Sequence, residues 1–270
     1  MKIHPTAIVE DGAQLAGSVE IGPYCSIGAS CVLDEGVRLI SHVVITGRTR
    51  VGSRTIIHPH AALGGEPQMR RPSPETVSLV IGADNIIREG VTMSVGSGVG
   101  RGTTSVGNRC YLMAYSHVGH DCRVGDDVTL SNGALLGGHA DIGDGVILGG
   151  QACVQQFGRV GRFAFISGLS GVTTDVIPYG MGIGLHVRLG GLNLIGLRRR
   201  NVPRANIHAL RAVYRAIFLA DEGTIHDNAK RAAEQWPDVP EVRDVVSFIL
   251  ADAKRPISPA RKRGGEVDAD

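Results

Sequence analysis

Aromatic residues and long apolar segments are scarce in this sequence. Phe, Trp and Tyr together make up 4% of its 270 residues, and no apolar run approaches the roughly 18 residues that mark a membrane-spanning helix. The formal net charge of +2 is too small to indicate nucleic acid as a partner. We therefore expect a soluble protein with no membrane insertion and no nucleic-acid partner, built around a core too slim for large rings.

Cysteine is also scarce, and its spacing is irregular. The chain has 5 cysteines, an odd number without metal-ligand spacing. Disulfides persist in oxidising compartments and are rare in the cytosol. We interpret these cysteines as small reduced core or corner residues, which favours a cytoplasmic location: Cys25, Cys31, Cys110, Cys122 and Cys153.

An aliphatic residue recurs at every sixth position. The pattern runs without exception from Ile3 to Leu63, resumes in phase at Ile81, slips by one residue before Val106 and ends at Val172. A period of six fits neither a helix nor a simple alternating strand. It is typical of hexapeptide repeats, in which each repeat forms one short strand and one corner. Residues 1–190 are therefore predicted to form a left-handed parallel β-helix.

Two segments interrupt the repeat, near 64–80 and 96–105. The first contains prolines and two arginines, and the second is rich in glycine and coincides with the one-residue slip. Loops that interrupt a rigid scaffold often carry function. A surface insertion without function is the alternative interpretation.

Polar residues suited to acyl transfer recur at one corner of the predicted coils. One coil beyond His120 lies Gly138, and a second coil leads to Gln156, so these residues should form a column. A neutral imidazole at His120 can take the proton of an attacking hydroxyl, and Asp121 can orient it. The Gly138 N–H can donate to the oxyanion of a tetrahedral intermediate. The alternative is a structural corner histidine.

The spacing of His117 and His120 also permits a metal site. A trimeric β-helix can assemble three histidines around zinc. No third histidine lies at a matching coil position, so zinc is the weaker interpretation.

The C-terminal part of the chain is predicted to be helical. A cap of helices over 191–254 should follow the solenoid, with Pro203 at one helix start and Thr224 as an N-cap. The tail 255–270 is expected to be disordered. A basic region on this cap is either a solvated helix face or a docking surface for an acidic carrier or a phosphate; it comprises Arg198, Arg199, Arg200, Arg204, Arg211 and Arg215.

Several stretches make most of the chain resemble the UDP-N-acetylglucosamine O-acyltransferase family, namely 4–9, 41–44, 87–89, 117–121, 138–139, 156–157 and 193–200. The resemblance implies transfer of a 3-hydroxyacyl chain from acyl carrier protein to the 3-hydroxyl of the sugar nucleotide, at the start of lipid A synthesis. It implies no cofactor beyond the thioester donor. It also implies a homotrimer with the site between adjacent subunits.

The resemblance assigns a role to individual residues. His120 matches the general base, Asp121 its support, Gly138 the oxyanion donor and Gly168 the residue that limits acyl-chain length. The positions that match substrate-binding residues are His117, His139, Gln156, Arg71, Asn193, Arg199 and Arg200.

The sequence departs from the family at acceptor-side positions. Met69 replaces an aspartate, Ile195 a glutamate, and Ser94 and Gln155 replace histidines. A lost hydrogen-bond partner changes substrate discrimination. One alternative that follows is a relative that acylates another sugar nucleotide or an amine. A second alternative, based on the histidine spacing, is a metal-dependent β-helix enzyme of the carbonic anhydrase type.

Overall fold

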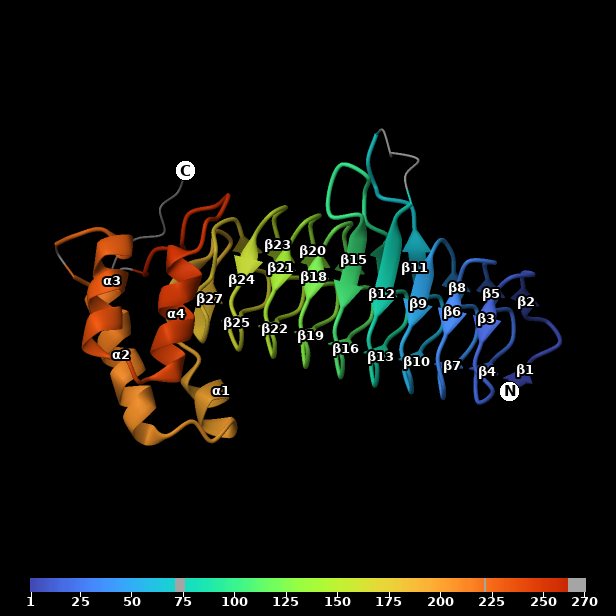
Figure 1. Cartoon of the computed structure of the whole chain (residues 1–270), viewed down its shortest axis with the longest axis horizontal. Coiled ribbons are helices and arrows are strands. Elements are labelled where there is room, and N and C mark those ends of the chain that lie inside the picture. The colour runs from blue at the N-terminus through green and yellow to red at the C-terminus, as the bar shows by residue number, and fades with distance from the viewer. Residues whose placement is uncertain (71–75, 221, 262–270) are drawn as a thin grey trace.

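The computed structural model describes residues 1–70, 76–220 and 222–261. These residues form a left-handed parallel β-helix whose short strands stack into three flat sheets, A, B and C, with a helical cap at the C-terminal end (Figure 1). The period-six prediction of the fold is confirmed.

Sheet A contains β1 (Lys2–Ile3), β4 (Glu20–Ile21), β7 (Arg38–Leu39), β10 (Ile56–Ile57), β13 (Ile86–Ile87), β16 (Tyr111–Leu112), β19 (Thr129–Leu130), β22 (Ile147–Leu148), β25 (Phe165–Ile166), β27 (Gly180–Ile183) and β28 (Arg188–Leu192). Sheet B contains β2 (Ile8–Val9), β5 (Ser26–Ile27), β8 (Val44–Ile45), β11 (Ala62–Gly65), β14 (Thr92–Ser94), β17 (His117–Val118), β20 (Leu135–Leu136), β23 (Cys153–Val154) and β26 (Gly171–Val172). Sheet C contains β3 (Gln14–Leu15), β6 (Val32–Leu33), β9 (Thr49–Val51), β12 (Ser78–Ile81), β15 (Thr103–Val106), β18 (Arg123–Val124), β21 (Asp141–Ile142) and β24 (Arg159–Val160).

The aliphatic residue of each hexad fills the core. In β17 and β20, Val118 and Leu136 are fully buried and lie in register, whereas the residue before each points outward. Side chains alternate between the faces of a strand, so a two-residue strand presents one to the core and one to the surface. Each of the three sheets contributes one such side chain per coil to a narrow core along the solenoid axis, which explains why large rings are scarce.

Many corners are made by a residue in the left-handed backbone conformation. At the corner between sheets B and C, Asp121, His139 and Phe157 have φ of 60°, 62° and 62°. This conformation is unfavourable for residues other than glycine. It is compensated here by backbone bonds between coils: the His139 N–H donates to the His120 carbonyl at 2.8 Å, and Phe157 donates to Gly138 at 3.1 Å.

The chain leaves the solenoid twice on the same side, between β11 and β12 and between β14 and β15 (Figure 1). These are the two segments where the sequence repeat is interrupted. Residues 71–75 of the first loop, including Arg71, lie outside the described residues.

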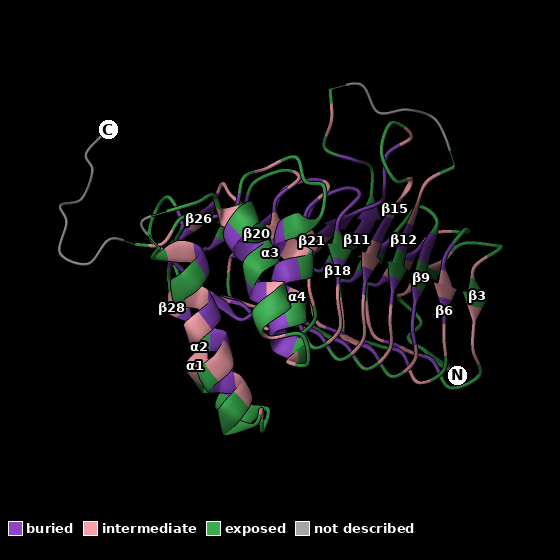
Figure 2. Ribbon diagram, turned by 60° about the vertical axis from the view of Figure 1, so that its left-hand side comes forward, coloured by how far each residue is buried: buried purple, intermediate pink, exposed green. Residues whose placement is uncertain are grey.

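The cap follows an antiparallel hairpin of β27 and β28. It consists of α1 (Leu194–Arg199), α2 (Arg204–Phe218), α3 (Ile225–Gln235) and α4 (Pro240–Leu250), and the Thr224 side chain caps α3 by accepting from the Asp227 N–H. Figure 2 shows that these helices carry buried residues on one face and exposed residues on the other. Among the helices in the described ranges, none has the length and apolar content that a bilayer crossing requires.

The expectation of disorder from Arg255 onwards is wrong for residues 255–261. Ile257 and Ala260 form parallel bridges with Asp175 and Leu189, and Ser258 is fully buried. Backbone groups of this segment are paired with Asp175 and with Leu189 of β28, which offsets the entropy lost on ordering the segment. Residues 262–270 lie outside the described residues.

Candidate active site

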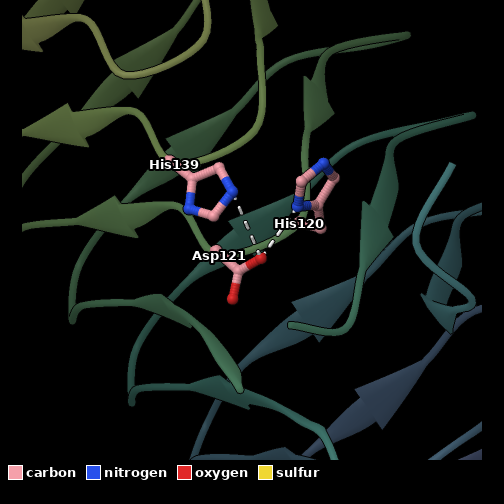
Figure 3. A group of neighbouring side chains, drawn as sticks. All are labelled: His120, Asp121 and His139. Atoms are coloured by element: carbon pink, nitrogen blue, oxygen red, sulfur yellow. Dashed lines mark hydrogen bonds and ion pairs between the residues drawn. The ribbon is translucent and has the colours of Figure 1, made fainter. Parts of the chain in front are cut away.

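His120 lies at the corner between sheets B and C, just after β17, and only 7% of its surface is exposed. Its Nδ1 is 2.8 Å from Asp121 Oδ2 (Figure 3). An ionised carboxylate only accepts hydrogen bonds, so Nδ1 carries the proton in the neutral ring and Nε2 has a free lone pair. The pair therefore presents a base at Nε2.

Asp121 is fully buried yet richly hydrogen-bonded. It accepts from the Ser97 hydroxyl at 2.6 Å and from the Arg101 N–H at 2.7 Å. Burial acts to raise the pKa of this carboxyl, but the bonds from Ser97, His120 and Arg101 outweigh burial and hold the pKa below its usual value. Asp121 is thus an anion at neutral pH, suited to stabilising an imidazolium.

Gly138, one coil beyond His120, lies against the base. A Cβ added to Gly138 would lie 2.5 Å from His120 Nε2, so only glycine fits without displacing the ring. The Gly138 N–H has no acceptor among the residues that the structure describes. A free backbone donor beside the base is what a developing oxyanion requires.

His139 and Phe157 continue the same corner. The His139 ring is edge-on to His120 with centroids 5.0 Å apart, and it stacks on Phe157 at 4.4 Å. Burial lowers the pKa of His139, although the nearby Asp121 charge opposes this. We conclude that His139 is held rigidly and is neutral at neutral pH.

His117 lies on the outer face of β17, beside the base. Its Nδ1 is 2.8 Å from the Thr92 hydroxyl, and burial lowers the pKa of the ring. Along sheet B, His117 is in register with Leu135, Cys153 and Gly171 on successive coils. Leu135 is 45% exposed, so an apolar surface begins next to the polar site.

Two contacts with the end of the chain were not expected from the sequence. The Arg255 guanidinium donates to the Gln156 carbonyl at 2.7 Å and to the Gln155 side chain at 2.9 Å. Lys254 Nζ lies 3.9 Å from the centroid of the Phe157 ring. No periodic signal relates these residues to the coils around 155, so sequence reasoning could not find them.

The structure separates another group of predicted residues from this corner. Arg200 stacks over Phe163, with its guanidinium carbon 3.8 Å from the ring centroid, at the corner between sheets C and A. Asn193 caps α1: its Oδ1 accepts from the Gly196 N–H at 2.9 Å, and its Nδ2 donates to the Phe163 carbonyl at 3.0 Å. Arg199 is exposed on the same helix.

Gly168 occupies the third corner, between sheets A and B. A Cβ there would lie 3.2 Å from the Gly150 carbonyl oxygen of the preceding coil, which is a tight contact. One chain therefore brings together the predicted base, its carboxylate, the glycine amide and Gln156. The same chain places Gly168 at the corner between sheets A and B, and the group from Asn193 to Arg200 at the corner between sheets C and A.

The His120, Asp121 and His139 side chains are close enough to suggest a metal site. Their bonding does not fit one. Both Asp121 oxygens already accept N–H or O–H donors, including the Ser97 hydroxyl, and a divalent ion would have to displace them. The donor set matches an oriented base rather than a metal centre.

Comparisons with known proteins agree on one family. A family profile described as "Udp N-acetylglucosamine O-acyltransferase; Domain 2" matches residues 175–258, and a profile of bacterial transferase hexapeptides matches residues 103–138. The chain is 51% identical over 257 residues to the acyl-[acyl-carrier-protein]–UDP-N-acetylglucosamine O-acyltransferase of Caulobacter vibrioides, covering 95% of this chain and 97% of that protein. It is 46% identical over 265 residues to the Rhizobium johnstonii protein of the same name, covering 98% and 97%.

Solved structures give the same result. A UDP-N-acetylglucosamine acyltransferase crystal structure matches with a TM-score of 0.93 at 37% identity, covering 97% of this chain and 100% of that one. The Francisella novicida UDP-N-acetylglucosamine acyltransferase matches with a TM-score of 0.90 at 34% identity, covering 95% and 94%.

Proposed function

Since the chain belongs to the UDP-N-acetylglucosamine O-acyltransferase family, we propose that His120 is the general base of its acyl transfer. The chain is an O-acyltransferase that moves an acyl group from acyl carrier protein to UDP-N-acetylglucosamine in lipid A biosynthesis. We further propose that the donor carries a 3-hydroxyacyl chain, that the acceptor is the sugar 3-hydroxyl, and that the chemistry needs no resident cofactor.

The proposed reaction uses the groups at the corner between sheets B and C. His120 Nε2 takes the proton of the sugar hydroxyl as its oxygen attacks the thioester carbon. Asp121 stabilises the imidazolium through the bond to Nδ1, and the Gly138 N–H donates to the oxyanion. Collapse of the tetrahedral intermediate breaks the C–S bond, and the imidazolium returns its proton to the departing sulfur.

The binding residues fall into two groups in this proposal. His117, His139 and Gln156 lie around the base and are assigned to the substrate near the reacting hydroxyl. Arg71, Asn193, Arg199 and Arg200 are assigned to the same substrate from an adjacent subunit. The support for a homotrimer is the separation within one chain: Arg200 lies at the corner between sheets C and A, away from His120.

The donor side has two proposed elements. The basic residues of α2, Arg204, Arg211 and Arg215, are exposed and suited to docking the acidic acyl carrier protein. Gly168 is assigned as the residue that sets acyl-chain length, because its missing side chain leaves no stop at that corner.

The observation that carries the proposal is the 2.8 Å bond of His120 to Asp121, with Gly138 against the opposite ring nitrogen. We expect His120→Ala to lose about 100- to 10,000-fold in kcat, the usual contribution of a general base. The assay is mass spectrometry of the acylated sugar nucleotide formed from acyl carrier protein thioester.

His42→Ala is the matched control, because His42 is also a corner histidine but lies at the corner between sheets A and B. Equal activity of the two variants would refute the role of His120. A panel of sugar nucleotides in the same assay tests the identity of the acceptor. This test matters because the sequence departs from the family at acceptor-side positions, namely Met69, Ile195, Ser94 and Gln155.

A further inference from the structure

The loop between β14 and β15 surrounds the Asp121 carboxylate with donors. The Ser97 N–H lies 3.1 Å from both oxygens, and the Ser97 hydroxyl donates to Oδ2 at 2.6 Å. The N–H groups of Arg101 and Gly102 donate to Oδ1 at 2.7 and 3.1 Å. A buried carboxylate has lost its water, and charge-assisted bonds of this kind replace it.

The same loop is tied to the next coil of the solenoid. The Arg101 guanidinium donates to the Asp121 carbonyl at 2.9 Å and forms two bonds with the Asp141 carboxylate, at 2.9 and 2.6 Å. Asp141 belongs to β21 on sheet C, whose backbone is fixed by its ladder. Arg101 therefore fixes the loop to a rigid element.

The loop also touches Asp121 directly through backbone. A Cβ added to Gly100 would lie 2.5–2.6 Å from the Asp121 carboxyl carbon and both of its oxygens. A side chain at this position would displace the Asp121 carboxylate from the place where it bonds to His120. Glycine is required here for close approach, since Gly100 has no positive φ.

We propose that the 96–102 loop is the positioning element of the catalytic pair, with Ser97 and Arg101 as positioning residues that hold Asp121 against His120. The inference rests on the proposed role of His120 and extends it to a loop with no residue assigned to substrate binding. The Ser97 hydroxyl and His120 Nδ1 share Oδ2, at 2.6 and 2.8 Å, so fixing one bond directs the other.

The first test removes the shared hydroxyl. Ser97→Ala should lower kcat about tenfold, the lower end of what a hydrogen bond to a charged group supplies, while KM for both substrates stays unchanged. Ser116→Ala is the matched control, because Ser116 is an equally buried serine whose hydroxyl has no partner among the described residues. Ser97→Thr, which keeps a hydroxyl, should recover part of the lost kcat.

The second test moves the carboxylate without removing any donor. Gly100→Ala should lower kcat about 100-fold, because a displacement near 1 Å in a catalytic array costs that much. Gly17→Ala is the matched control: Gly17 has no positive φ, and nothing lies within 4 Å of an added Cβ.

A pH profile separates positioning from general damage. Ser97→Ala removes a bond that favours ionised Asp121, so the acid limb of kcat should move to higher pH. Within the described part of the chain, the other charged or titratable groups near Asp121 are His120, His139, Arg101 and the Cys122 thiol, with Asp141 paired to Arg101, and all are unchanged in this variant. A purely structural role of Ser97 would leave the limb in place.

Asp141→Asn covers the case in which Ser97→Ala does not fold. It loosens only the partly exposed end of the Arg101 anchor, and kcat should fall about threefold, a loss typical of a weak surface ion pair. Unchanged kcat in Asp141→Asn and Gly100→Ala would overturn the inference.

The outcome also separates this inference from the proposed function. If His120→Ala is as active as its control, His42→Ala, the proposed role of His120 as general base fails. The loop then has no catalytic pair to position. If His120→Ala is inactive but Ser97→Ala and Gly100→Ala behave as their controls do, only the positioning role is wrong.

Discussion

Replacing Gly138 by alanine tests the geometry of the base most directly. The added methyl would lie 2.5 Å from His120 Nε2 and 2.6 Å from Cε1. Non-bonded carbon atoms approach to about 3.5 Å, so the imidazole would have to retreat by about 1 Å. The ring is held by the 2.8 Å bond to Asp121, and that bond would stretch or break.

The expected result is a fall of about 100-fold in kcat, the cost of a 1 Å misplacement in a catalytic array. Overpacking should also reduce the free energy of unfolding by about 1–3 kcal/mol. Steady-state kinetics with saturating acyl carrier protein thioester and chemical denaturation measure the two effects separately. The Gly138 N–H is retained, so the loss would come from the base and not from the oxyanion donor.

Gly28→Ala is the control for the effect of adding a methyl group to a coil of the β-helix. An added Cβ there would make only ordinary contacts, the nearest at 3.6 Å, and Gly28 lies on an N-terminal coil far from His120 in the chain. A Gly138→Ala enzyme with kcat within about threefold of Gly28→Ala would refute the assigned position of the base.

Three further outcomes are expected. Gly168→Met should shift the preference of the enzyme to shorter acyl donors, by about fourfold for each excluded methylene, because each loses about 0.8 kcal/mol of burial. An equal loss of activity on all donors would show that Gly168 serves only to form the corner. Replacing Arg204, Arg211 and Arg215 by glutamine should raise KM for acyl carrier protein thioester at low salt and make that KM less dependent on salt. If the unaltered enzyme used acyl-coenzyme A equally well, docking of the carrier protein on α2 would be contradicted. Ser116→Ala should raise the free energy of unfolding by about 1 kcal/mol, because its buried hydroxyl is unpaired among the described residues, and destabilisation in urea would contradict this.

The sequence alone was sufficient to place the column that carries the proposed base. Every coil of a β-helix repeats the same strand and corner, so a fixed step along the chain brings residues to neighbouring positions in space. That rule predicts Gly138 next to His120, and the structure shows the two in close approach. The helix N-cap at Thr224 was also predictable, because its signal lies within one turn of chain.

The tertiary structure decided the features that depend on contacts between distant parts of the chain. The sequence marks the 96–105 segment only as an interruption, and nothing in the repeat indicates that it folds over Asp121. The return of Arg255 to Gln155 and Gln156 was likewise missed, and a disordered tail was expected instead. A periodic scaffold determines its own neighbours locally, whereas the path of a loop or a terminal segment depends on which buried polar groups elsewhere need partners.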